Sequence, residues 1–187
     1  MTNTKNTDTK IITGKVRLSY CKIFNPEPDD NGEPKYSTAI LIPKTDKVTL
    51  QKIKAAVEAA KEAGKGKWGG KIPPNLKTPL RDGDAEKDTD EHPEYKGHYF
   101  LNATSRQKPG IVDKQLNEII DSTEVYSGCY ARVSLNFYAY EAKGNRGIAA
   151  GLNNVQKMAD GEHLGGGRSR AEDDFDAIED DEDDYLN

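Results

Sequence analysis

Cysteine is scarce in this chain of 187 residues, which contains only Cys21 and Cys129. Two cysteines cannot make the disulfide framework of a small secreted domain, so we expect a reducing compartment and two small buried thiols. The histidines His92, His98 and His163 are scattered, and no CxxC, HxH or HExxH spacing occurs. We therefore expect no structural zinc site, no other bound metal and no cofactor.

Long apolar runs are also missing. No stretch approaches the ~18 apolar residues of a membrane span, and no apolar segment of the signal-peptide type opens the chain. Hydrophobic residues make up only 34% of the chain and charged residues 32%. We expect an intracellular protein without a membrane partner, with room for one domain of about 150 residues and its appendages.

Basic residues are absent from the last seventeen positions, 171–187, which hold ten of the 32 carboxylates. Residues 1–170 contain all 27 Lys and Arg beside 22 Asp and Glu, so a body of formal charge +5 is joined to a tail of −10. Blocks of like charge are typical of disordered interaction tails. A basic body that carries its own polyanion favours a nucleic-acid binder with a built-in competitor.

The tail also contains apolar residues, which a purely solubilising tail does not need. We predict that it binds protein partners through these residues and the carboxylates near its end: Phe175, Ile178, Asp183, Asp184, Tyr185 and Leu186. A Gly-rich linker over 161–170, with three successive glycines at 165–167, gives the tail freedom to move.

Hydrophobic periodicity predicts a mainly β protein. In Lys10–Phe24, Val16, Leu18 and Tyr20 share one strand face. Further strands are predicted at Lys35–Ile42, Tyr95–Thr104, Val125–Tyr140 and Arg146–Leu152, separated by a loop at 25–34, an irregular stretch at 65–94 and a turn-rich segment at 106–121.

A single helix is predicted in mid-chain, from about Lys47 to Ala63. Leu50, Ile53 and Val57 make its apolar stripe, and Gly64 is a natural C-terminal stop. Five strands and one helix match an OB-fold, a small barrel whose face and loops bind oligonucleotides. We thus predict a disordered N-terminus (1–9), an OB-fold-like five-stranded barrel with long loops (10–160), the linker (161–170) and a disordered acidic tail (171–187).

The predicted strand Val125–Tyr140 carries the strongest functional signal. Its odd positions are nearly all apolar, whereas its even positions include four tyrosines and an arginine, at Tyr126, Tyr130, Arg132, Tyr138 and Tyr140. Exposed tyrosines suit single-stranded nucleic acid, because a base stacked on an aromatic ring contributes ~1–3 kcal/mol whatever its sequence. The alternative is that some of these tyrosines pack under a loop or at a dimer contact.

A second aromatic and basic segment follows the predicted helix. Trp68, the only tryptophan, lies among Lys65, Lys67 and Lys71 and several glycines. A mobile basic loop with an aromatic residue suits a groove that follows a nucleic-acid strand. The alternative is a tryptophan packed under the barrel with solvated lysines around it.

The remaining candidate DNA-binding residues lie on strands and loops elsewhere in the chain. They are basic residues that neutralise phosphates and aromatic residues of the Tyr95–Thr104 strand, whose buried side the sequence leaves open: Lys15, Arg17, Tyr99, Phe100, Arg106, Lys108, Lys143 and Arg146.

Catalysis has little support in the sequence. An acidic loop between Asp82 and Glu94 offers oxygen ligands of the kind that Mg²⁺ prefers, so a metal-dependent nuclease is one rival function. No apolar frame fixes the geometry of this loop, and catalysis needs a preorganised site. We therefore predict a binding protein that is not an enzyme. A structural or assembly protein, also a β-barrel with an acidic arm, is a second rival.

Several segments together resemble a family of phage single-stranded DNA-binding proteins. The family is described as an uncharacterised-domain family of phages of Gram-positive hosts, similar in design to coliphage replication single-stranded DNA-binding proteins. The resemblance lies in the acidic tail and in segments that recur in order: TGKVR (13–17), YFLNA (99–103), PGIVD (109–113), YSGCYAR (126–132), FYAY (137–140) and GIAAGLN (147–153).

This resemblance implies an OB-fold that binds single-stranded DNA without sequence preference. It also implies that the acidic tail contacts replication or recombination proteins and that the protein works in the cytoplasm of the host cell. A homodimer is left open by the sequence.

Overall fold

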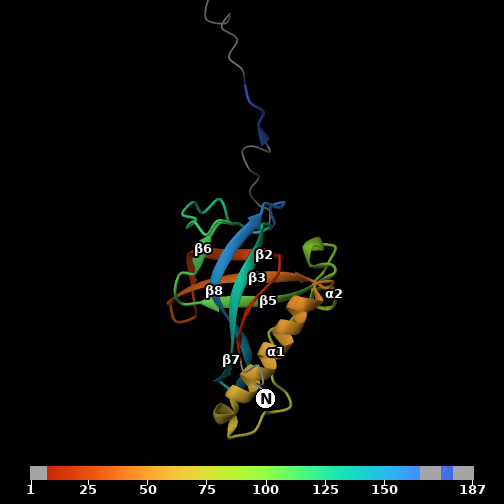
Figure 1. The fold of residues 1–187 in the computed structure, drawn as a ribbon, viewed down its shortest axis with the longest axis vertical. Helices are drawn as coiled ribbons and strands as arrows, with labels where there is room; N and C mark the ends of the chain where they lie inside the picture. Colours follow the sequence, from red (N-terminus) through yellow and green to blue (C-terminus); the bar gives the residue numbers. More distant parts are fainter. Residues whose placement is uncertain (1–7, 165–173, 179–187) are drawn as a thin grey trace, which may run out of the picture.

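The computed structural model describes residues 8–164 and 174–178, which contain a β-barrel with one long helix, α1 (Lys47–Ala63), at its side (Figure 1). The strands are β1 (Lys10–Ile12), β2 (Val16–Pro28), β3 (Pro34–Pro43), β4 (Arg81–Asp82), β5 (His98–Ser105), β6 (Gly110–Val112), β7 (Tyr130–Ala142) and β8 (Asn145–Ala159). Short helical turns lie at η1 (Lys65–Trp68), α2 (Gly83–Glu86) and η2 (Pro93–Tyr95).

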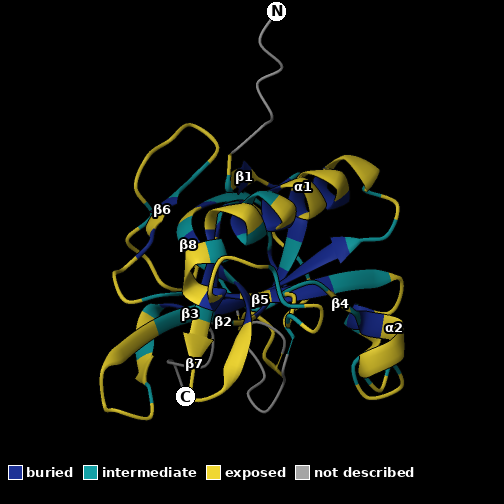
Figure 2. Cartoon of the chain, turned by 90° about the horizontal axis from the view of Figure 1, so that it is seen from below, coloured by how far each residue is buried: buried dark blue, intermediate teal, exposed yellow. Residues whose placement is uncertain are grey.

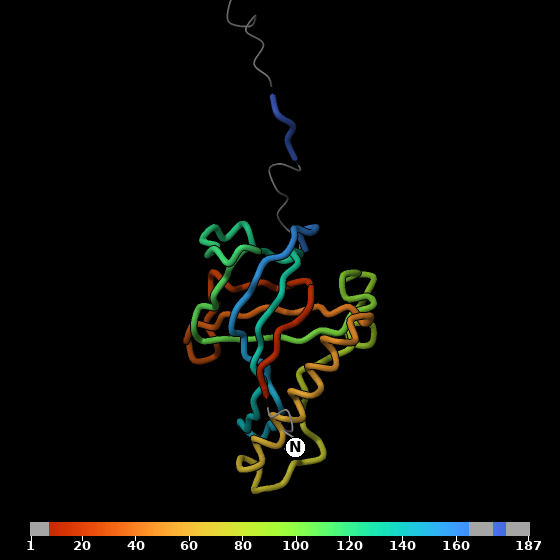
Figure 3. Tube along the Cα trace, in the orientation of Figure 1, coloured from red at the N-terminus to blue at the C-terminus, as the bar shows by residue number. Residues whose placement is uncertain are grey.

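Five of these strands close into a ring, as the sequence predicts. The order is β7-β2-β3-β5-β8, and β8 pairs with β7 to complete the circle. Each neighbouring pair is antiparallel except β5 and β8, which run parallel with Ala103 opposite Ala150. Figure 3 shows the β7–β8 hairpin running across the direction of β2, β3 and β5. Strands β1, β4 and β6 extend the sheet beyond the ring.

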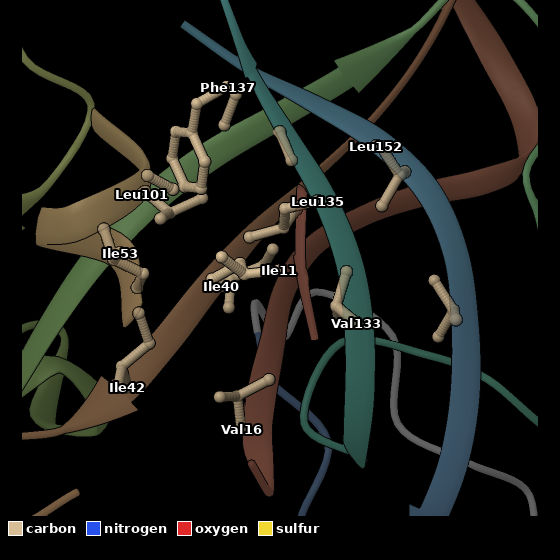
Figure 4. Close-up of a cluster of buried hydrophobic side chains, with 14 of the residues drawn as sticks. Ile11, Val16, Ile40, Ile42, Ile53, Leu101, Val133, Leu135, Phe137 and Leu152 are labelled. Atoms are coloured by element: carbon tan, nitrogen blue, oxygen red, sulfur yellow. The ribbon is translucent and has the colours of Figure 1, made fainter. Parts of the chain in front are cut away.

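The alternating pattern of β7 builds much of the barrel interior. Ala131, Val133, Leu135 and Phe137 are all buried, and Figure 4 shows three of them meeting core residues of the other strands. Burial of such side chains stabilises the fold by about 1.5–3 kcal/mol for each large one. The core face of this strand is therefore the one that the sequence predicts. Cys129 is buried too, and burial raises the pKa of the neighbouring half-buried Cys21 thiol to about 12.

Helix α1 closes one side of the barrel. The Asp46 side chain accepts a hydrogen bond from the Thr49 amide at 3.1 Å and caps the first turn. Leu50, Ile53 and Val57 are buried, and Figure 2 shows this buried stripe facing the barrel with exposed residues behind it. The helix ends at Gly64, where a side chain would collide with Ala139. Within the described ranges no helix is long and apolar enough to cross a membrane.

Several bounds differ from the sequence prediction. The predicted strand Lys10–Phe24 is divided into β1 and β2, β5 begins only at His98, β6 lies in the predicted turn-rich segment at 106–121, and β8 extends to Ala159. β7 begins at Tyr130, so Val125–Cys129 is a turn-rich segment instead of strand. β2 runs to Pro28 and shortens the predicted loop at its end. The irregular stretch at 65–94 contains the ordered turns η1 and α2 and the short strand β4. Pairing with other strands sets the strand bounds, and local periodicity does not reveal this pairing.

Tyr20 is the clearest error in the predicted β2 pattern. The prediction places Tyr20 on the buried face with Leu18, but its side chain is 50% exposed, and Ser19 is buried at 4%. A β-bulge shifts the pairing with β3 between Ser19 and Lys22, and the Tyr20 backbone takes a left-handed φ of 46°. An extra residue in one strand reverses which side chains point inward.

Candidate nucleic-acid interface

A wide groove lies on the outside of the barrel. This groove has a volume of about 860 Å³ and is lined by β5, β8, the segment 77–81, Glu86 and Tyr140. In an OB-fold the outer face of the second and third ring strands is the usual oligonucleotide surface. Here these strands are β3 and β5, so the groove begins on that face.

The floor of the groove is made of small and polar side chains. On β5, Leu101 and Ala103 point into the core, whereas Asn102 and Thr104 point outward. On β8 the lining includes Ala149 and Ala150, whose small side chains leave the floor low. A low polar floor lets an extended chain approach the barrel backbone.

Tyrosines of β7 stand beside this floor. Tyr138 is 42% exposed, and a side chain at Gly151 would reach within 3.7 Å of its ring. Tyr140, two residues along the same face, lines the groove itself. Tyr138 and Tyr140 are therefore the predicted tyrosines at the groove, and Tyr138 is the more exposed of the two.

Lys77 and Arg81 are the basic residues that line the groove. The predicted cations lie on the segments that continue from its lining strands, which we call the rim, and some of them are paired with carboxylates. Arg106 donates to Asp29 at 2.8 Å, and this ion pair lowers the pKa of the Asp29 carboxyl. Arg146 lies 3.5 Å from Glu141 on the β7–β8 hairpin, and Lys143 is exposed in the turn of that hairpin. Lys108 lies with its ammonium 5.4 Å from the Phe24 ring centre. These cations are half-exposed or exposed, so phosphates can reach them.

Four other predicted residues lie instead at the segment that follows β8. Tyr126 stacks on His163 with ring centres 3.9 Å apart, and its hydroxyl donates to the Gly161 carbonyl at 3.0 Å. Arg17 donates to the Glu162 carbonyl at 2.8 Å. Lys15 and Arg17 both lie over the Tyr130 ring, 4.9 Å and 5.5 Å from its centre. These residues pack around the segment that follows β8, and they do not line the groove.

Trp68 does not present its ring to solvent. The side chain is 9% exposed and belongs to the main core, and its Nε1 has no hydrogen-bond partner among the described residues. The turn η1 folds back after α1, and Lys67 donates to the Ala139 carbonyl at 2.9 Å, which holds the ring inward. Packing under the barrel, the alternative reading of this segment, is therefore the one that the structure shows. Lys65 pairs with Glu62, and Lys71 is exposed.

The aromatic residues of β5 are likewise covered. Phe100 is 2% exposed and meets Tyr95 edge to face, with ring centres 5.1 Å apart. Tyr99 is half-buried, with the Lys44 ammonium 5.1 Å from its ring centre. Arg132 is exposed on the outer side of β7, where its Nε lies 3.5 Å from the Thr13 carbonyl oxygen. Phe100 therefore serves as a buried support and not as a free stacking surface.

The predicted acidic loop is a structural element. Asp82 caps α2 by accepting from the Asp84 amide at 3.0 Å, and Lys44 bridges Asp82 and Asp84 at 2.8 Å and 2.7 Å. These hydrogen bonds lower the pKa of both carboxyls and raise that of Lys44. Across residues 8–164 and 174–178, no group of three or more His, Cys, Asp or Glu side chains is placed to hold a metal ion.

The structure adds residues that the sequence prediction did not include. Arg81 and Glu86 line the groove, and Tyr20 is exposed with the Lys87 ammonium 6.0 Å from its ring centre. Arg81 lies in a stretch without periodicity, and the bulge in β2 breaks the alternation at Tyr20, so the sequence pattern does not indicate that either residue is exposed.

In the tail, Phe175 and Ile178 are 74% and 91% exposed, and Asp183, Asp184, Tyr185 and Leu186 lie outside the described residues.

Comparison with known proteins gives consistent matches. The model of the family described as Enterobacter phage Enc34, ssDNA-binding protein, matches residues 9–186. The structure of the single-stranded DNA-binding protein from bacteriophage Enc34 in complex with ssDNA is 29% identical in sequence, with a TM-score of 0.71 over 84% of this chain and 90% of that one. Protein p50 of Acyrthosiphon pisum secondary endosymbiont phage 1 is 30% identical over 90% of this chain and 94% of its own length.

A more distant structure shares the fold. The single-stranded DNA-binding protein gp2.5 of bacteriophage T7 is 13% identical, with a TM-score of 0.61 over 86% of this chain and 97% of that one. These matches confirm the predicted barrel and the resemblance to phage single-stranded DNA-binding proteins. The link to phages of Gram-positive hosts stays a prediction.

Proposed function

Because this chain belongs to the family of the Enterobacter phage Enc34 single-stranded DNA-binding protein, we propose that it binds single-stranded DNA along the outer groove of its barrel. The observation that supports this location is the combination found there: small and polar side chains of β5 and β8 on the floor, the exposed ring of Tyr138 beside it, and the cations Lys77 and Arg81 in the lining. The family's members are binding proteins, which confirms the prediction that the chain is not an enzyme.

The groove suits a strand with free bases. Tyr138 stacks on a base, and Arg106, Lys108, Lys143 and Arg146 neutralise phosphates from the rim. Stacking on a ring and attraction to phosphate are both independent of base identity, so binding has no sequence preference. One such barrel occupies ~4–16 nucleotides. Bases inside a duplex are already stacked on their neighbours, so the same surface discriminates against double-stranded DNA.

The acidic tail acts on the same groove in this proposal. The tail has a formal charge of −10 and the rest of the chain +5, so the tail is attracted to the basic rim and competes with DNA for it. When DNA displaces the tail, its exposed Phe175 and Ile178 become free to bind replication or recombination proteins in the host cytoplasm. In this proposal the barrel and the tail are separate parts of one chain, and the predicted linker over 161–170 begins on the barrel, where residues 161–164 are held.

A binding titration tests this function. The full chain is titrated into a labelled oligo-dT of about 16 nucleotides and into a duplex of equal length, at several salt concentrations. We expect a clear preference for the single strand and an affinity that falls steeply as salt rises. Equal affinity for the duplex and the single strand would contradict the proposed function.

Tyr138 provides the matched variants for the site. Tyr138→Ala is expected to weaken oligo-dT binding by about 1–3 kcal/mol, because a stacked base loses its partner. Tyr138→Phe keeps the ring and is expected to bind nearly as the native chain does. If the alanine variant also binds normally, the stacking surface lies elsewhere on the barrel.

A further inference from the structure

Arg81 is held in a fixed plane at the edge of the groove. It belongs to the short strand β4, where its backbone pairs with Phe100 of β5. Its Nε and Nη2 both donate to Oε1 of Glu86, at 2.9 Å and 2.8 Å. Two donors of one planar group bound to one carboxylate oxygen fix the orientation of that plane. The ion pair also raises the pKa of Arg81, whose guanidinium is charged in any protein environment.

The Arg81 guanidinium lies over the Phe100 ring. The Arg81 guanidinium carbon lies 5.3 Å from the ring centre, within the range of a cation–π contact. Phe100 is buried and is held in turn by Tyr95. The Arg81 side chain is nevertheless 50% exposed and lines the groove. Phe100 therefore lies on one side of the guanidinium, and the exposed half of the side chain, here called its open face, is available within the groove.

The segment that carries Arg81 and Glu86 is anchored on both sides. Asp82 caps α2, and Lys44 joins Asp82 and Asp84 to β3. Gly83 packs so closely that a side chain there would lie 2.5 Å from the Tyr95 carbonyl oxygen. The spacing between Arg81 and Glu86 is consequently set by a rigid turn and not by two free side chains.

We propose that Arg81 stacks its open face on a base of the bound single strand, and that Glu86 and Phe100 are positioning residues for this contact. The inference rests on the proposed function and adds a stacking surface that contains no exposed aromatic ring. A guanidinium between an aromatic ring and a base gains a contact on each face. Glu86 accepts hydrogen bonds from two of the five N–H donors of Arg81. The other three donors remain for a phosphate or a base edge.

Stacking on Arg81 distinguishes single-stranded from double-stranded DNA, which charge attraction alone does not. A base inside a duplex offers no free face, so the Arg81 contact forms only with single-stranded DNA. Lysine at the same position keeps the positive charge but has no planar group to stack. Substitution by lysine therefore separates stacking from phosphate attraction.

The test compares Arg81→Lys with the native chain on two strands of equal length, oligo-dT and a backbone that carries no bases. Loss of the stacked base is expected to weaken oligo-dT binding about fivefold to thirtyfold, whereas the two proteins bind the abasic strand alike. Arg106→Lys is the matched control. Arg106 pairs with a carboxylate but, within the described ranges, packs on no aromatic ring, so its variant is expected to show no difference between the strands.

Glu86→Ala gives a second test, because charge removal and loss of positioning change the DNA affinity in opposite directions. The variant removes a negative charge from the groove, which by attraction alone would tighten DNA binding. If Glu86 positions Arg81, binding to oligo-dT weakens instead. Glu141→Ala, which removes the carboxylate beside Arg146, is the control and is expected to tighten binding slightly. Melting temperatures close to the native one confirm that each variant is folded.

The outcomes separate this inference from the proposed function. If the native chain shows no preference for oligo-dT over duplex, the proposed function itself fails. If the native chain binds oligo-dT as expected, two results overturn the Arg81 contact alone. One is an equal loss by folded Arg81→Lys on the oligo-dT and abasic strands. The other is tighter binding by Glu86→Ala.

Discussion

At the scale of single residues, burial decides which of the aromatic side chains can meet DNA. Tyr138 is 42% exposed beside the groove, whereas Trp68 and Phe100 are buried at 9% and 2%. Tyr126 is occupied by His163. Residue type alone therefore identifies candidates, and the packing around each ring selects among them.

Trp68 should report on stability and not on DNA. Because the ring lies in the core, oligo-dT is expected to leave the emission of this single tryptophan almost unchanged. Trp68→Phe should lower the free energy of unfolding by about 1–3 kcal/mol, since it leaves a partial cavity. Its affinity for oligo-dT should equal that of the native chain. Strong quenching by DNA, or lost affinity in the folded variant, would place Trp68 at the interface.

At the scale of elements, the sequence predicts what local periodicity controls. The alternation of Val133, Leu135 and Phe137 predicts the buried face of β7, and the stripe of α1 predicts its packed side. The exposure of Tyr20 depends on a bulge that forms only when β2 pairs with β3, so alternation fails there. Arg81 meets Glu86 and Phe100 through a turn and a distant strand, and no spacing in the sequence signals that meeting.

The turn between β4 and η2 is expected to be sensitive to small changes. Gly83→Ala would place a methyl group 2.5 Å and 2.7 Å from the carbonyl oxygens of Tyr95 and His98. Forced rearrangement of such close packing typically costs about 1–3 kcal/mol, which denaturant unfolding measures. Gly66→Ala is the control, because a side chain there meets nothing within 4 Å. Equal stability of the two variants would show that the turn tolerates displacement.

At the scale of the whole molecule, charge is divided between the parts of the chain. The body of residues 1–170 has a formal charge of +5, although the complete chain has −5. The rim cations of the groove also have carboxylate partners within the barrel, such as Asp29 for Arg106 and Glu141 for Arg146. DNA thus competes with internal carboxylates as well as with the tail.

Removal of residues 171–187 is expected to tighten oligo-dT binding, most of all at low ionic strength. The deletion removes a competitor of charge −10 from a chain whose remainder is basic. A full-length chain whose ten tail carboxylates are replaced by amides is the control, and it should behave like the deletion. Affinities that do not change in ~20 mM salt would show that the tail does not compete with DNA.

The central claim is that single-stranded DNA lies in the outer groove of the barrel, and NMR mapping tests it most directly. Amide signals of the full-length, isotope-labelled chain are followed while an oligo-dT of about 12 nucleotides is added. We predict that the largest changes occur at Asn102, Thr104, Tyr138 and Gly151, with little change along the exposed side of α1. Changes concentrated on α1, with the groove signals unmoved, would contradict the account.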